Sequence, residues 1–254
     1  AHPLAWALSR KEDSSLLASI QGYFEGIEAD GFLDQLREQY FSDRGFDYVG
    51  ARAFLGHIDA RLPRYSPYFK KMAKQTGLDW RLLAAVGYQE SMWNPNAISP
   101  TGVTGLMMLT AGAAKEVGVT DRRDPQQSIE GGTRYLKSIY DKLEEIKEPH
   151  RTWFALAAYN MGFGPLDDAR SLTAKQGGDP NNWFDVEKCI PLLQNPAYYR
   201  NTHGYSQAAR QAVAYVRNIR RYYDTLVWAT VQPVKPYTPM PNTIAALPQK
   251  NIVL

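Results

Sequence analysis

"WRLLAAVGYQESMWNP", residues Trp80 to Pro95, ends a mostly apolar run with a single carboxylate, that of Glu90. Asp79 precedes the run and is a favourable helix N-cap. Asn94 stands before a proline and is disfavoured in helical geometry, so we expect the helix to end near it. Glu90 then lies in the last turn. Its neighbours three, four and seven positions back, on the same helix face, are Gly87, Val86 and Leu83.

This position favours the protonated form of Glu90. Apolar surroundings penalise the charged carboxylate and raise its pKa, and the negative end of the helix dipole acts in the same direction. A glutamate that is protonated near neutral pH is suited to general-acid catalysis. The alternative is that the side chain points into solvent, the ordinary place for a lone glutamate on an amphipathic helix.

The rest of the chain predicts a mainly α protein, because strand patterns are nearly absent after residue 46. Helix starts are indicated by Ser66 with Pro67, by Asp79, by a capping box of Asp124, Pro125 and Gln127, by Thr152, and by Gly164 with Pro165. Gly77 and Gly177 mark helix ends, and a long helix is predicted over residues 206–230.

The first 43 residues have a different pattern. "HPLAWALS" is typical of a short strand, and "SLLASIQGYFEGIEADGFLDQLREQYF" predicts an amphipathic helix that Gly31 interrupts. We therefore expect three parts: a short α/β fragment over 1–43, a helical domain over 44–230, and a proline-rich extended tail over 231–254.

Composition excludes several classes of protein. The net charge of +3 over 254 residues lacks the dense Lys and Arg pattern of a nucleic-acid binder. Cys189 is the single cysteine, so no internal disulfide forms, and the four histidines show no metal-ligand spacing. No apolar run reaches the roughly 18 residues of a membrane span, and the N-terminus does not have a signal-peptide pattern.

Two further stretches carry polar groups in unusual settings. "NPNAISPTGVTGLMMLT", residues 94–110, is a loop rich in Gly, Pro and Ser that ends in an apolar run and supplies the hydroxyls of Ser99 and Thr101. "FALAAYNMGFGP" brings Tyr159 and Asn160 to the end of an alanine-rich helix. Taken alone, a plain surface loop, a core tyrosine and a capping asparagine are the alternatives.

The order "ESMWNPNAISPTGVTGLMML", "DPQQSIEGGTRYL", "ALAAYNMGFG" resembles the catalytic domain of family 1 lytic transglycosylases over roughly residues 60–230. The resemblance implies a lysozyme-like, goose-type helical fold and cleavage of peptidoglycan without a metal or organic cofactor. It implies peptidoglycan glycan strands and muropeptides as partners, with no nucleic acid, and a periplasmic location at the outer membrane. In the membrane-bound F subfamily, which "SPTGVTGLMML" resembles, a solute-binding-like module precedes the catalytic one. Residues 1–43 are similar to the end of such a module, which implies a regulatory contact.

The resemblance also assigns residues to roles. It implies that Glu90 is the catalytic acid and base. The residues that it places at the substrate are Ser91, Ser99, Met107, Tyr159, Asn160 and Tyr215. There are two departures from the family pattern: Met108 stands where glutamine is usual, and Gln211 where glutamate is usual. Both bear on sugar binding.

Glu90 has no obvious acidic partner, because no Asp or Glu lies between Ser91 and Lys115 or between Thr152 and Leu166. Most glycoside hydrolases use two carboxylates, so this absence fits a route with one carboxylate in which the substrate's N-acetyl group assists. Two alternatives stay open. One is a lysozyme-type hydrolase of the same bond, and the other is a glycan-binding domain without catalysis.

Overall fold

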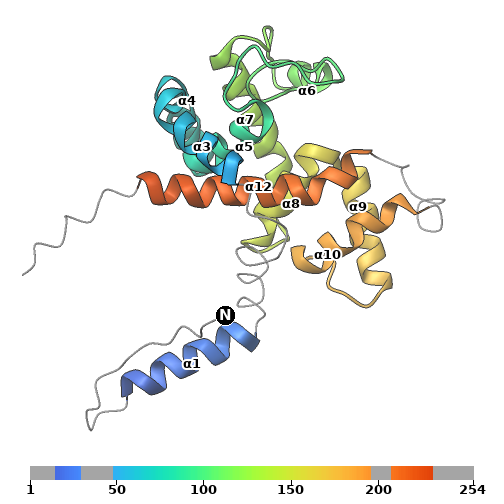
Figure 1. Cartoon of the computed structure of the whole chain (residues 1–254). Helices are drawn as coiled ribbons and strands as arrows, with labels where there is room; N and C mark the ends of the chain where they lie inside the picture. The colour runs from blue at the N-terminus through green and yellow to red at the C-terminus, as the bar shows by residue number, and fades with distance from the viewer. Residues whose placement is uncertain (1–14, 30–47, 196–206, 231–254) are drawn as a thin grey trace, which may run out of the picture. The chain divides into compact units, whose positions relative to one another are not determined.

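The computed structural model describes residues 15–29, 48–195 and 207–230 (Figure 1). The chain forms two compact units, Ala1–Leu55 and Gly56–Leu254. Several predictions lie outside the described residues: the strand in "HPLAWALS", the helix segment after Gly31, the boundary at 43/44 and the tail over 231–254. The division into three parts therefore stays a prediction.

The prediction of a mainly α protein is confirmed. The helices are α1 (Ser15–Ala29), α3 (Tyr48–Ala60), α4 (Leu62–Thr76), α5 (Trp80–Ser91), α6 (Ala111–Glu116), α7 (Pro125–Asp141), α8 (His150–Met161), α9 (Phe163–Lys175), α10 (Trp183–Cys189), η1 (Ile190–Gln194) and α12 (Gln207–Thr230). Among the described residues, β-structure is limited to one antiparallel bridge between Ile98 and Thr104. No helix in these parts of the chain is long and apolar enough to cross a membrane.

Helix α1 belongs to the first unit, and its amphipathic pattern predicted it. Several of its apolar side chains are exposed: Leu16, Leu17, Tyr23 and Phe24.

In the second unit, α5 is surrounded by other helices. It packs against α4 and α12, while α8 packs against α7 and α12 (Figure 1). The side chains of Leu83, Val86 and Phe154 are fully buried. Burial of such side chains stabilises the folded state by about 2 kcal/mol each, and it places both ends of α5 at fixed positions.

Four predicted helix boundaries are confirmed, because the chemistry that sets them is local. Asp79 caps α5 by accepting a 2.9 Å hydrogen bond from the Arg81 backbone N–H. Asp124 caps α7 in the same way from Gln127, at 2.8 Å. Gly77 ends α4 with φ of 76°, a left-handed conformation that glycine adopts without a steric penalty. Helix α12 covers the long helix predicted over 206–230.

Two predicted starts are wrong. Helix α4 begins at Leu62, and Pro67 lies inside it. Pro67 has no N–H to donate to the Pro63 carbonyl, and the Ser66 hydroxyl donates a long, 3.5 Å hydrogen bond to that carbonyl instead. Helix α8 begins two residues before Thr152, whose hydroxyl donates to the Glu148 carboxylate at 2.9 Å.

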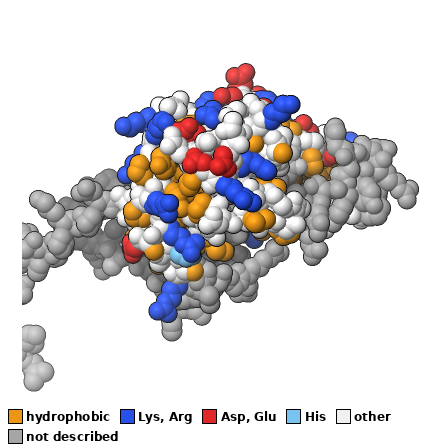
Figure 2. Space-filling model, turned by 90° about the horizontal axis from the view of Figure 1, so that it is seen from above, with side chains coloured by type: hydrophobic (Ala, Val, Ile, Leu, Met, Phe, Trp, Pro, Cys, Tyr) orange, Lys and Arg blue, Asp and Glu red, His pale blue; other side chains and the backbone are white. Residues whose placement is uncertain are grey.

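Charge is dispersed over the face shown in Figure 2, where Lys and Arg side chains stand apart among hydrophobic and uncharged atoms. The absence of one continuous basic surface on this face agrees with the modest net charge of +3.

Candidate functional site: the carboxylate at the end of helix α5

Helix α5 ends directly after Glu90, and the chain then turns sharply. Met92 and Trp93 both have left-handed backbone conformations, with φ of 52° and 55°, which costs about 1–2 kcal/mol for each residue with a Cβ atom. Two hydrogen bonds hold the turn. The Trp93 indole donates to the Ala84 carbonyl at 2.8 Å, and Arg61 donates to the Met92 carbonyl at 2.8 Å. The strained turn fixes where α5 stops, and so fixes the position of Glu90.

The carboxyl of Glu90 is paired with a phenol from the far end of the sequence. Tyr215 of α12 donates a 2.5 Å hydrogen bond to Glu90 Oε1, across a separation of 125 residues. The Tyr215 side chain is 5% exposed. Burial, followed by the charge of Glu90, holds the pKa of Tyr215 well above its usual range, so the phenol keeps its proton and acts as a donor.

Two opposing effects set the protonation of Glu90. Burial raises the pKa of Glu90 from 4.5 to about 7, and the hydrogen bond from Tyr215 opposes this rise by stabilising the carboxylate. A pKa near 7 leaves both forms well populated at neutral pH. A single group that must first give and then take a proton works best under this condition.

Tyr159 connects the carboxyl to the apolar loop. Its hydroxyl, on α8, donates a 2.8 Å hydrogen bond to the Met107 carbonyl. Burial and then the charge of Glu90 raise the pKa of Tyr159 well above its usual value. The two side chains are therefore close enough to interact electrostatically. Tyr135 of α7 packs edge-on against the Tyr159 ring, with centroids 5.6 Å apart.

Met107 is fully buried, and contacts hold both its backbone and its side chain in place. Its backbone N–H donates to the Ser128 hydroxyl at 3.0 Å. Its side chain lies against two helical glycines. A Cβ atom at Gly132 would come within 2.5 Å of the Met107 Cβ, and one at Gly87 within 3.3 Å of the Met107 sulfur. The loop therefore sits on α5 and α7 at a distance that only glycine allows.

Ser91 is also buried, at 7% exposure. Its hydroxyl donates to the Leu106 carbonyl at 2.8 Å and to the Gly87 carbonyl at 3.1 Å. These contacts tie the end of α5 to the same loop. The resemblance implies that Ser91 lies at the substrate, and this stays a prediction; in the structure its hydroxyl contacts the protein's own backbone.

Within the described residues, Ser99 and Asn160 are not held by buried hydrogen bonds of this kind. The Ser99 hydroxyl is 3.0 Å from the Thr101 hydroxyl and accepts the Val103 N–H at 3.0 Å, within the turn that the Ile98–Thr104 bridge closes. Asn160 is partly exposed, and its buried Oδ1 atom accepts no hydrogen bond from the described residues. This amide oxygen beside Tyr159 is a buried polar atom whose acceptor capacity the described residues leave unused.

The structure brings four of the seven predicted residues into one connected group: Glu90, Tyr215, Tyr159 and Met107. The sequence patterns did not indicate that Ser128 or the Gly87–Gly132 pair contributes to the site. Gly132 and Ser128 are four residues apart on α7, and therefore share a helix face. A serine and a glycine together on an apolar helix face were the available signal.

Among the described residues, no second carboxylate contributes to the pKa of Glu90, which depends on burial and on Tyr215. The parts of the chain that the structure describes also contain no group of three His, Cys, Asp or Glu side chains placed to hold a metal ion. The site thus consists of the Glu90 carboxyl with a pKa near neutral pH, the Tyr215 phenol as a donor, and the nearby Asn160 amide oxygen.

Comparison with known proteins identifies the class to which this domain belongs. Residues 67–182 match the model of the transglycosylase SLT domain family. The chain therefore contains a domain of that family, as its sequence motifs predicted. The matched range begins in α4 and ends just before α10, so it includes Glu90, Tyr159 and Asn160, whereas Tyr215 lies beyond it.

Particular relatives are proteins named membrane-bound lytic murein transglycosylase F. The chain is 51% identical to the one from Alcanivorax borkumensis over 229 residues, which is 89% of this chain and 49% of that protein. It is also 51% identical to the one from Ectopseudomonas mendocina over 230 residues, covering 89% and 47%. The chain thus spans about half the length of these curated relatives. The 70 kDa soluble lytic transglycosylase from Escherichia coli superimposes with a TM-score of 0.47 at 24% identity, covering 64% of this chain and 24% of that one.

Proposed function

We propose that this protein is a peptidoglycan lytic transglycosylase. It cleaves the β-1,4 bond from N-acetylmuramic acid to N-acetylglucosamine and leaves a 1,6-anhydro end on the muramic sugar. The observation that carries this proposal is the Glu90 carboxyl, with a pKa of about 7 and a 2.5 Å hydrogen bond from Tyr215. The SLT-domain match and the names of the relatives support it.

The proposed reaction needs one carboxyl group. Protonated Glu90 donates its proton to the bridging oxygen, the C1–O4 bond breaks, and N-acetylglucosamine leaves with the new hydroxyl. The carbonyl oxygen of the muramic N-acetyl group stabilises the cationic C1 atom. The Glu90 carboxylate then accepts the proton of the 6-hydroxyl of the same sugar as its oxygen bonds to C1. Glu90 ends protonated, and no water is consumed.

The surrounding residues divide into two groups in this proposal. Tyr215 acts directly on Glu90, because its hydrogen bond stabilises the carboxylate that forms when the proton leaves. Asn160 and Ser99 are the substrate-contacting residues. Ser91, Met107 and Tyr159 position the site through the contacts described above.

Product analysis tests the reaction. Purified sacculi are digested with the protein, and the released muropeptides are weighed. We expect 1,6-anhydro products, which are lighter by one water than the reducing ends that a lysozyme-type hydrolase makes. Reducing ends alone would reject the transglycosylase reaction in favour of hydrolysis. Binding without any product would support a glycan-binding domain.

Substitution tests the role of Glu90. Glu90→Gln keeps the shape and the hydrogen bond from Tyr215 but cannot exchange a proton. It is expected to abolish turnover while the circular dichroism spectrum stays unchanged. Glu144→Gln is the matched control, because Glu144 is exposed on the surface, and this variant is expected to keep full activity. If the Glu90→Gln protein were active, the catalytic acid would have to be another residue.

The proposal extends to location and regulation. We propose a periplasmic location at the outer membrane, and the names of the relatives, which describe them as membrane-bound, support association with a membrane. Residues 1–43 are proposed as the end of a solute-binding-like module that acts on the catalytic domain. Comparing the activity of the chain with and without these residues, in the presence and absence of muropeptides, tests this. Equal activities would count against regulation by this segment.

A further inference from the structure

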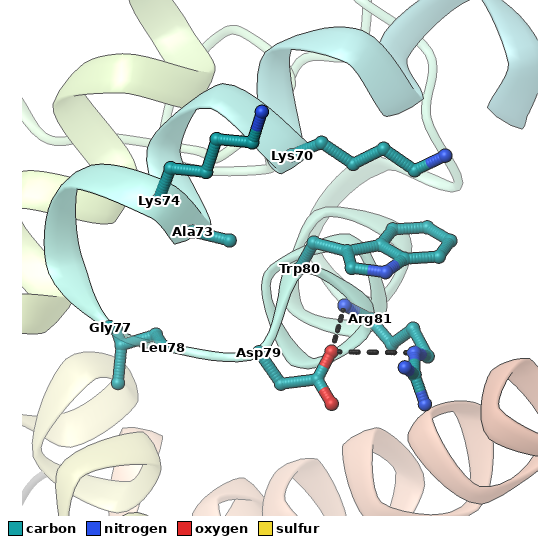
Figure 3. A pocket seen from close by; sticks show the side chains of 8 residues that line it. All are labelled: Lys70, Ala73, Lys74, Gly77, Leu78, Asp79, Trp80 and Arg81. Carbon is teal, nitrogen blue, oxygen red and sulfur yellow. Dashed lines mark hydrogen bonds and ion pairs between the residues drawn. The ribbon is translucent and has the colours of Figure 1, made fainter.

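An open cavity with basic side chains along its edge lies at the opposite end of α5 from Glu90. It has a volume of about 530 Å³ and opens between the second half of α4 and the start of α5 (Figure 3). Its floor is the Trp80 side chain, with Lys70 and Lys74 of α4 on one side and Arg81 on the other. None of these residues takes part in the site around Glu90.

The lysines are free to bind an anion. Lys70 and Lys74 are four residues apart on α4 and so share a helix face. Both are exposed, and neither forms a hydrogen bond or ion pair with the residues that the structure describes. The Lys70 ammonium lies 4.9 Å from the centre of the Trp80 ring. This cation–π contact holds one charge above the indole face.

On the opposite wall, Asp79 holds the Arg81 side chain in place and neutralises its charge. Asp79 accepts the Arg81 N–H at 2.9 Å, and its carboxylate lies 3.4 Å from Arg81 Nε. The Tyr223 hydroxyl donates to the other oxygen of Asp79 at 3.1 Å. With Arg81 engaged by Asp79, the two lysines carry the unbalanced positive charge of the cavity.

This distribution of charge selects a kind of anion. Phosphate groups are recognised best by a free guanidinium fork, and here the guanidinium is paired with Asp79. A carboxylate carries less charge than a phosphate, so Asp79 repels it less. The Lys70 ammonium above the indole and the Lys74 ammonium one turn further along α4 are compact charges that suit a carboxylate. We infer that this cavity binds the carboxylates of an acidic peptide, and that the stem peptide of peptidoglycan is its occupant.

The choice of the stem peptide rests on the proposed function and on length. Trp80 and Glu90 are ten residues apart on one helix, which corresponds to about 15 Å at 1.5 Å per residue. An extended peptide of about five residues spans roughly 16 Å. Since other helices cover α5, this distance is the shortest path, and a stem peptide attached to a sugar at Glu90 brings its carboxylates to Lys70 and Lys74 only when it is fully extended.

The test measures binding of the free stem peptide, without sugar, to the whole chain by calorimetry. Lys70→Gln combined with Lys74→Gln is expected to weaken binding roughly three- to tenfold, which is the range for two exposed ion pairs. Lys115→Gln combined with Lys175→Gln removes the same charge from exposed positions elsewhere and is expected to change nothing. Added salt is expected to weaken binding to the unaltered protein.

Three results would overturn the inference. They are absence of peptide binding, equal binding of the peptide when its carboxyls are converted to amides, and tighter binding of inorganic phosphate than of the peptide. Because the probe contains no glycosidic bond, the outcome does not depend on turnover. Peptide binding together with a failure to cleave sacculi would reject the proposed function and keep the cavity assignment.

Discussion

Replacing Glu90 by glutamine is expected to stabilise the folded protein at alkaline pH, although it abolishes the proposed activity. The pKa of Glu90 is about 7 in the folded protein, against an ordinary value of 4.5. The folded state therefore holds this proton more tightly than the unfolded chain does. As pH rises from 4.5 to about 7, the folded state loses stability through this group, and the loss is complete above about 7.

The magnitude follows from the difference between the two values. One pKa unit corresponds to about 1.4 kcal/mol, so a rise from 4.5 to about 7 corresponds to at most about 3.5 kcal/mol. Glutamine has nearly the same shape and accepts the same hydrogen bond from Tyr215, but it has no charge to bury. The Glu90→Gln protein is therefore expected to gain up to about 3.5 kcal/mol over the unaltered protein at about pH 8.

The assay is urea unfolding of both proteins over a series of pH values. Glu130→Gln serves as the control with the opposite sign. A hydrogen bond from Lys71 is the main cause that lowers the pKa of Glu130, so this group stabilises the folded state above its unfolded pKa and loses that effect as pH falls. If the stability difference between Glu90→Gln and the unaltered protein does not grow with pH, the carboxyl is not held in a desolvated position.

Two further substitutions probe the site. Tyr215→Phe removes the hydrogen bond that opposes the pKa rise of Glu90, so the basic limb of the pH–rate profile is expected to move to higher pH; a move to lower pH would contradict this assignment. Gly132→Ala places a Cβ atom 2.5 Å from the Met107 Cβ and is expected to lower the unfolding free energy by about 1–3 kcal/mol. Gly56→Ala in α3 meets open space and is expected to raise it by up to about 1 kcal/mol; equal effects of the two alanines in urea unfolding would refute the close seating of the loop.

The sequence by itself determined the features that depend on near neighbours. Asp79 and Asp124 cap their helices because each carboxylate reaches a backbone N–H two or three residues ahead. Gly77 ends α4 because a residue without a Cβ atom adopts the left-handed conformation freely. The apolar run before Glu90 placed that residue at the end of a buried helix by the same local reasoning, and the order of motifs indicated the family.

Only the tertiary structure decided which groups surround Glu90. Tyr215 reaches the carboxyl from 125 residues away because α12 packs against α5. Ser128 and Gly132 seat Met107 because α7 faces the loop, and Ser91 turned out to hold that loop in place. Periodicity along a chain identifies the face that a helix buries. The partner that the face meets depends on how helices far apart in sequence pack, and packing set both the hydrogen bond and the desolvation that tune the pKa of Glu90.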